Sequence, residues 1–169
     1  MMKVLVLIED LFNEFEFVYP FYRFQEAGFA VDVAGPVAKA TYLGKSGLPV
    51  EATTAVSDVR ASDYVALVIP GGYAPDRMRR QKPFVSVVSK AAQQGLVIAA
   101  ICHGTSLLIE ADLLRGRKAT GAAAIATDIK NAGATFIDAE VVVDGKLVTS
   151  RKPEDLPAFC RETLKLLQK

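Results

Sequence analysis

The sequence predicts an α/β fold in which helices cover both faces of a mostly parallel sheet. Short apolar runs, typical of strands buried on both faces, alternate with segments whose apolar residues recur at helical spacing. Glycines follow some of these runs, as in a doubly wound sheet, where ligands bind at the carboxyl ends of the strands. The length of 169 residues suits a single domain spanning residues 1–169.

Two buried strands and an intervening helix are predicted at the start of the chain. Lys3 to Ile8 forms the first apolar run, and Phe29 to Ala34 gives the second strand. The helix is expected from about Glu14 to Ala27, with Gly28 closing it and Pro20 bending or delaying it. It carries an apolar stripe suited to the core or to a subunit interface, formed by Phe15, Val18, Tyr19 and Tyr22.

The next segment combines a hairpin with the third core strand. Turn residues within Tyr42 to Glu51 predict a small hairpin, and its Lys45 is expected to be solvated. Asp63 to Pro70 supplies another buried strand, which Gly71 and Gly72 follow. Glycines at such a position let backbone amides approach a ligand or a neighbouring loop closely.

Two helices are predicted between this strand and the next. The first is short and follows Asp76, and its Arg77, Arg79 and Arg80 form a solvated face or a subunit contact. The second stops before Gly95. Its apolar stripe consists of Phe84, Val87, Val88, Ala91 and Ala92.

The stretch from Leu96 to Ile109 joins a buried strand to a helix through one cysteine. Cys102 follows the small Ala100 by two positions and precedes Gly104 by two, which is the pattern of a nucleophile elbow. The tight, strained turn of an elbow excludes bulky side chains at those positions. Amides of the first helical turn would then face the sulfur and favour the thiolate. The pattern alone leaves open that Cys102 is a core residue.

The remaining chain adds two helices and a hairpin. Leu113 to Lys118 is interpreted as a helix end, and Ala123 to Ala132 as a glycine-capped helix. Glu140 to Val148 predicts a hairpin with an Asp-Gly turn. The last helix begins at Pro153 and places Cys160 in its apolar stripe.

Composition narrows the class of protein. Hydrophobic residues make up 51% of the chain, charged residues make up 23%, and the net charge is +1, as in a compact globular domain. We expect no specific nucleic-acid partner, because no basic stripe with interleaved aromatics occurs. Apolar runs are too short for a bilayer, and acidic residues interrupt any early signal sequence, so a cytoplasmic protein without a membrane partner is expected. His103 is the only histidine, and no zinc-like cysteine spacing occurs, which predicts no metal site.

A set of motifs occurs in order along nearly the whole chain. They are Glu14-Phe15-Glu16 ahead of Tyr19-Pro20, Pro70-Gly71-Gly72 with Ala74-Pro75-Asp76, Ala100-Ile101-Cys102-His103-Gly104, Leu114-Arg115-Gly116-Arg117-Lys118, Asn131-Ala132-Gly133, Asp138-Ala139-Glu140-Val141-Val142-Val143-Asp144-Gly145 and Ser150-Arg151. Together they resemble the PfpI family of intracellular proteases and glycases, within the superfamily of the Parkinsonism-associated deglycase. The resemblance implies a flavodoxin-like, three-layer α/β/α sandwich related to class I glutamine amidotransferases.

The resemblance also implies roles for five residues. Cys102 corresponds to the nucleophile and Glu16 to the carboxyl that hydrogen-bonds its sulfur. A carboxyl in such a secluded position has a raised pKa and can hold a proton. Gly72 and the backbone amide of His103 correspond to donors of an oxyanion hole. Asp76 corresponds to an acid that some relatives supply to the histidine from a neighbouring subunit. No cofactor is implied.

Three positions depart from what is common in the family. Asp76 stands where glutamate is common, and its shorter reach weakens the link to His103. Asn13 stands where an acid is often found, and Ala122 where a pocket tyrosine is often found. We therefore expect the substrate specificity to differ from that of many relatives.

Three functions from different classes follow. In the first, a glyoxalase III or protein deglycase acting in stress protection, Cys102 attacks methylglyoxal, glyoxal or their protein adducts, and Glu16 helps to isomerise the hemithioacetal. In the second, an intracellular peptidase or amidase acylates Cys102 on short or unfolded chains. In the third, Cys102 is oxidised to a sulfinate in a redox sensor or chaperone. A cofactor-binding flavodoxin is disfavoured because no dinucleotide fingerprint occurs. A homodimer or larger homo-oligomer is expected.

Overall fold

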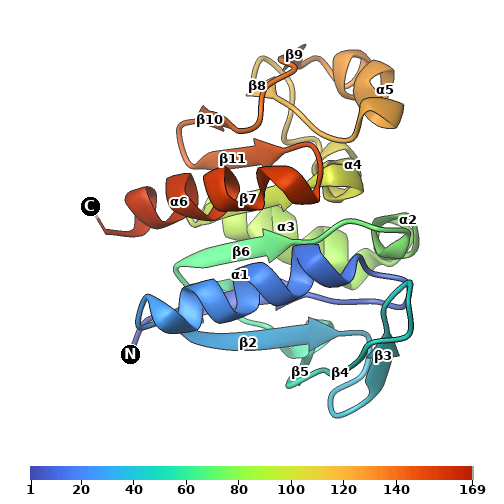
Figure 1. Cartoon of the computed structure of the whole chain (residues 1–169), viewed down its shortest axis with the longest axis vertical. Helices are drawn as coiled ribbons and strands as arrows, with labels where there is room; N and C mark the ends of the chain where they lie inside the picture. Colours follow the sequence, from blue (N-terminus) through green and yellow to red (C-terminus); the bar gives the residue numbers. More distant parts are fainter. Residues whose placement is uncertain (169) are drawn as a thin grey trace.

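The computed structural model describes residues 1–168, in which a seven-stranded sheet lies between two layers of helices (Figure 1). The strand order is β10-β11-β7-β6-β1-β2-β5. Every neighbouring pair is parallel except β10 with β11. Helices α1 and α6 cover one face, and α3 and α4 cover the other (Figure 1). The predicted α/β/α sandwich with a mostly parallel sheet is therefore confirmed.

The strands at the centre of the sheet are buried on both faces. Every residue of β6 (Ala66–Ile69) and β7 (Val97–Ile101) is buried, which is why both appear in the sequence as unbroken apolar runs. The other strands of this sheet are β1 (Lys3–Leu7), β2 (Ala30–Gly35), β5 (Thr54–Ala55), β10 (Val142–Asp144) and β11 (Leu147–Ser150). Separate two-stranded sheets are formed by β3 (Thr41–Leu43) with β4 (Pro49–Glu51), and by β8 (Lys118–Ala119) with β9 (Thr135–Phe136).

The predicted helices are present, some with a short 3-10 turn before them. The α-helices are α1 (Glu14–Glu26), α2 (Ala74–Met78), α3 (Lys82–Gln93), α4 (Thr105–Glu110), α5 (Ala126–Asn131) and α6 (Leu156–Leu167). The 3-10 turns are η1 (Val56–Asp58), η2 (Ala61–Asp63), η3 (Cys102–Gly104), η4 (Ala123–Ile125) and η5 (Pro153–Asp155). None of these helices combines the length and apolar character that crossing a bilayer requires.

Three expectations about boundaries are wrong. Pro20 does not delay α1, because the Asn13 side chain caps the helix upstream and starts it at Glu14. Leu113 to Lys118 is not a helix end: α4 stops at Glu110, and Lys118 belongs to β8, which pairs with β9. Asp63 belongs to η2, so β6 begins later than predicted.

The carboxyl ends of β1, β6 and β7 meet at one edge of the sheet because these strands are parallel neighbours. The segment after β1 is fastened to the segment after β6, since the Asn13 amide donates to the Gly71 carbonyl at 3.1 Å. Phe12 and Gly72 also form an antiparallel bridge. This edge holds the candidate site.

Candidate active site

Cys102 lies on the turn between β7 and α4 and has a strained backbone. Its φ is 61°, in the left-handed region that residues with a Cβ rarely adopt. A Cβ on Gly104 would collide with the Ile69 carbonyl oxygen, so the turn requires glycine there. The strand, strained cysteine and following helix have the geometry of a nucleophile elbow. Cys102 is partly exposed, while the predicted core residue Cys160 is 1% exposed, and both are free thiols.

Glu16 is placed beside Cys102 by the first turn of α1. Asn13 Oδ1 accepts from the amides of Phe15 at 3.1 Å and Glu16 at 3.3 Å, which fixes the start of the helix. The Glu16 side chain is fully buried, and its Oε2 accepts from the Gly71 amide at 2.7 Å. A Cβ on Gly71 would lie 2.5 Å from Glu16 Oε2 and 2.8 Å from Cys102 Cβ. The missing side chain at position 71 thus lets the carboxyl and the cysteine come together.

Burial governs the ionisation of Glu16. It raises the pKa of this carboxyl to about 7, although the Gly71 amide, the Cys102 thiol and the Lys45 charge act in the opposite direction. Oε1 of Glu16 is buried and makes no hydrogen bond of regular geometry with residues 1–168, so the thiol lies beside the carboxyl without a well-formed bond to it. Near neutral pH the carboxyl can therefore hold a proton or release it.

The Cys102 thiol is less acidic than the elbow pattern predicts. Backbone amides of His103 and Gly72 do lower its pKa, which places both predicted oxyanion-hole donors at the sulfur. Burial and the neighbouring Glu16 charge outweigh them and raise the pKa of the thiol to about 12. The amides of the turn act on the thiol in the expected direction but do not prevail over burial and the Glu16 charge, so the thiol must lose its proton as it reacts.

A cavity of about 470 Å³ opens onto Cys102. Its other lining residues are Gly121, Ala122, Ala123, Ala126, Phe136, Asp138, Arg151 and Lys152. Ala122, which stands where a pocket tyrosine is common, belongs to this wall. The side chains that η4 and the start of α5 present to the cavity are therefore small and apolar, which leaves room for a substrate at the sulfur.

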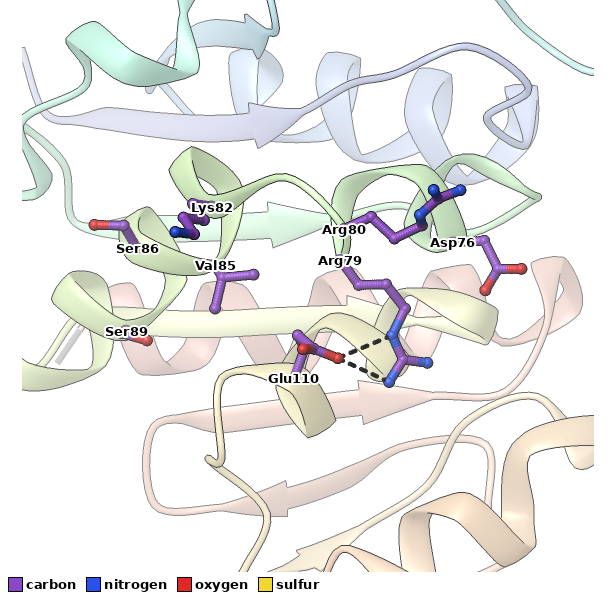
Figure 2. A pocket seen from close by; sticks show the side chains of 8 residues that line it. All are labelled: Asp76, Arg79, Arg80, Lys82, Val85, Ser86, Ser89 and Glu110. Atoms are coloured by element: carbon purple, nitrogen blue, oxygen red, sulfur yellow. Dashed lines mark hydrogen bonds and ion pairs between the residues drawn. The ribbon is translucent and has the colours of Figure 1, made fainter.

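His103 and Asp76 form no hydrogen bond or ion pair with each other within residues 1–168, although α2 packs against the turn that carries His103. His103 is half-buried, and its ring forms no hydrogen bond or ion pair with residues 1–168. Asp76 is exposed and lines a different cavity of about 700 Å³. Figure 2 shows Asp76 at one end of that cavity, apart from Arg79, which pairs with Glu110 at 3.1 Å. A single copy of the chain does not assemble a cysteine-histidine-acid triad.

The structure adds residues that the sequence did not single out for the site. Asn13 caps α1 and thereby positions Glu16. Asn is a common N-cap residue, so its place immediately before the predicted helix start is a sequence signal for this role. Lys45, expected to be merely solvated, lies 4.9 Å from the centre of the Tyr73 ring and acts on Glu16 through its charge. Lys152 and Phe136 line the cavity, and no local pattern signals either. Among residues 1–168, no cluster of side chains suited to a metal ion is present.

Comparisons with known proteins extend over the whole site. The model of the DJ-1/PfpI family matches residues 2–166. Deglycase TK1284 of Thermococcus kodakarensis is 45% identical over 99% of this chain and 100% of its own. Protein/nucleic acid deglycase 2 of Escherichia coli is 46% identical over 98% of this chain and 97% of its own. Putative cysteine protease YraA of Bacillus subtilis is 43% identical over 98% of both.

Solved structures show the same fold. A two-domain protein of Anabaena variabilis with DJ-1/ThiJ/PfpI-like and ferritin-like domains has a TM-score of 0.97 and 46% identity, and the match covers 99% of this chain and 48% of that one. Drosophila melanogaster DJ-1beta has a TM-score of 0.91 and 26% identity, and covers 99% of this chain and 91% of its own. The predicted flavodoxin-like architecture agrees with these structures.

Proposed function

The chain belongs to the DJ-1/PfpI family, and from this premise we propose that it is a cysteine-dependent deglycase that acts on methylglyoxal, glyoxal or their adducts on protein amines. Relatives named deglycase, at 42–46% identity, support a deglycase-type enzyme. The observation that carries the proposal is that buried Glu16 and the amides of Gly72 and His103 lie beside Cys102, and that a cavity opens onto Cys102 itself.

The first step is attack of sulfur on the aldehyde carbon. Because the pKa of Glu16 is about 7, part of this carboxyl is ionised near neutral pH, and the carboxylate beside the sulfur accepts the thiol proton in concert with formation of the carbon–sulfur bond. The aldehyde oxygen becomes the oxyanion, to which the Gly72 and His103 amides can donate. Transfer of the proton from Glu16 to that oxygen completes the hemithioacetal and restores the carboxylate.

Glu16 then acts as a shuttle. It removes the proton from the carbon bound to sulfur and returns a proton to the adjacent carbonyl carbon, so that an enediol collapses to the thioester of the 2-hydroxy acid. Water hydrolyses the thioester, releases lactate from methylglyoxal and restores the thiol. The overall change adds one water to methylglyoxal and needs no external oxidant or cofactor.

The test is cofactor-free conversion of methylglyoxal to lactate by wild type, Cys102→Ala and Glu16→Gln. We expect both substitutions to abolish lactate formation while the far-UV circular dichroism spectrum is kept. The enzyme proposal would be contradicted if the wild type formed no lactate. If mild peroxide then oxidised Cys102 selectively to a sulfinate, the redox-sensor hypothesis would take its place.

A peptidase or amidase is the second candidate, favoured by the relative named as a putative cysteine protease. The same elbow could be acylated by a peptide carbonyl, and a cavity of about 470 Å³ suits a short segment rather than a folded protein. Fluorogenic peptides tested beside methylglyoxal separate the two. Hydrolysis that depends on Cys102 in the absence of lactate formation would favour the peptidase.

We also propose that the chain forms a homo-oligomer in which Asp76 of one copy reaches His103 of another. The exposed Asp76 and the unpaired His103 ring within residues 1–168 support this arrangement. Light scattering after gel filtration measures the assembly, and Asp76→Asn should lower kcat without changing the mass. A monomeric active enzyme contradicts the proposal.

A further inference from the structure

The cavity at Cys102 contains a cation that has no partner. Arg151 Nη1 pairs with Asp138 Oδ1 at 2.7 Å, so these two lining charges neutralise each other. Lys152 lines the same cavity and is exposed, and its ammonium group makes no ion pair or hydrogen bond with residues 1–168. The charge offered to a ligand on this side of the sulfur is therefore that of Lys152.

The backbone of Lys152 is held in place while its side chain is free. Arg151 donates to the buried Asp155 from its amide at 3.1 Å, from Nε at 2.9 Å and from Nη2 at 3.1 Å. The Lys152 carbonyl oxygen in turn accepts from the Asp155 amide at 2.9 Å. This network fixes the point from which the flexible lysine stem reaches over the cavity.

The remaining wall cannot neutralise an anion. Ala122, Ala126 and Phe136 present apolar atoms, and the Arg151 guanidinium is already paired with Asp138 and Asp155. Glu154 is exposed two residues after Lys152, but it does not line the cavity and lies outside ion-pair distance of the ammonium. One unpaired cation suits a single negative charge better than a phosphate dianion, which needs several donors.

We propose that Lys152 binds a carboxylate of the substrate and thereby makes the site favour carbonyl compounds that carry one near the reacting carbon. For turnover, this inference rests on the proposed deglycase function. Adducts of free amino acids and of C-terminal residues carry an α-carboxylate, whereas adducts at the N-terminus or inside a polypeptide do not. Lys152 is then a specificity-determining residue, distinct from the reacting Cys102 and Glu16.

Alkylation of Cys102 tests the anion site without any enzymatic activity. Sulfur displaces iodide from iodoacetate or from iodoacetamide, two probes that differ by a carboxylate and a neutral amide. We expect Lys152→Met to lower the iodoacetate-to-iodoacetamide rate ratio about three- to tenfold at low ionic strength, the effect of one nearby charge. Lys152→Arg should keep the wild-type ratio. Peptide mass spectrometry follows both cysteines, and buried Cys160 should stay unmodified as long as the protein is folded.

The matched control is Lys90→Met, which removes one charge from exposed Lys90 on α3, a residue that does not line the cavity. Its ratio should equal that of the wild type. An unchanged rate ratio in Lys152→Met would overturn the proposal, because the Lys152 charge would then have no effect on the probe. An equal fall of the ratio in Lys90→Met would also overturn it, because the effect would then come from the net charge of the protein.

Turnover provides the second arm. Methylglyoxal hemithioacetals of N-acetylcysteine and of its amide differ by one carboxylate, and the wild type should show a lower KM for the charged adduct. Lys152→Met should remove this difference and Lys90→Met should keep it. If neither adduct yields lactate, the deglycase proposal fails, and the alkylation ratio alone still decides whether Lys152 binds anions.

Discussion

Replacing Glu16 with glutamine should stabilise the fold at alkaline pH while it destroys the proposed activity. Glu16 is fully buried and accepts one hydrogen bond, from the Gly71 amide at 2.7 Å. The glutamine side-chain oxygen can accept the same bond, so Glu16→Gln removes the ionisable group and little else. The remaining difference is the free energy needed to keep a carboxylate in this buried position.

The sign and size of the effect follow from the pKa of Glu16. Burial raises it from 4.5 to about 7, so between these pH values the native state holds a proton that the unfolded state has lost. The free energy of unfolding therefore falls as pH rises through this window. The stability that the protonated Glu16 gives the native state is fully present only below pH 4.5. At about 1.4 kcal/mol per pKa unit, the loss amounts to about 3 kcal/mol above pH 7.

Urea unfolding of wild type and Glu16→Gln at pH 5 and pH 8 measures this effect. The variant should gain about 3 kcal/mol on the wild type at pH 8, and most of that gain should vanish at pH 5. Glu51→Gln, which alters an exposed acid on β4, should leave the pH dependence unchanged. Parallel stability curves for wild type and Glu16→Gln between pH 5 and pH 8 would refute the reasoning about buried ionisation.

Three further predictions concern the same site. If Glu16 is the base, kcat/KM for methylglyoxal should rise about tenfold per pH unit up to pH about 7 and then level off, and a flat profile would contradict this role. Gly71→Ala places a methyl group 2.5 Å from Glu16 Oε2, so it should cost about 1–3 kcal/mol in urea unfolding and at least about tenfold in kcat, whereas wild-type values for both would show that the gap is not needed. Asn13→Ala removes the acceptor of two helix amides and should cost about 1 kcal/mol in thermal unfolding and lower kcat more than it raises KM; an unchanged kcat would show that the cap does not position Glu16.

The sequence carried enough information to predict the framework of the site. Buried parallel strands such as β7 appear as continuous apolar runs, and parallel pairing forces their carboxyl ends to one edge. The residues flanking Cys102 at two positions on either side indicated the elbow, and the structure explains one of them through the Ile69 carbonyl that faces Gly104. Steric rules of this kind are local, so a sequence pattern records them.

Features set by distant contacts were not predictable in the same way. Strands β5, β8 and β9 are two residues long, and they exist because a neighbouring strand pairs with them. Lys152 reaches the Cys102 cavity through the turn after β11, which no spacing near Cys102 reveals. The pattern near Cys102 indicates the local amides that lower the pKa of the thiol, whereas the burial and the Glu16 charge that raise it depend on the assembled fold.

The surroundings of His103 bear on which residue exchanges a proton with the Cys102 thiol. A cysteine-histidine pair works when a third group orients the imidazole, and within residues 1–168 the His103 ring has no such partner. Glu16 instead lies beside the sulfur, and its pKa of about 7 allows it to take and return a proton near neutrality. Moving a proton between adjacent carbons of a hemithioacetal needs such a group, whereas peptide hydrolysis also needs an acid at the leaving amine. The position of Glu16 beside the sulfur therefore supports the glycase chemistry proposed above, and it does so whether or not a second copy supplies an acid to His103.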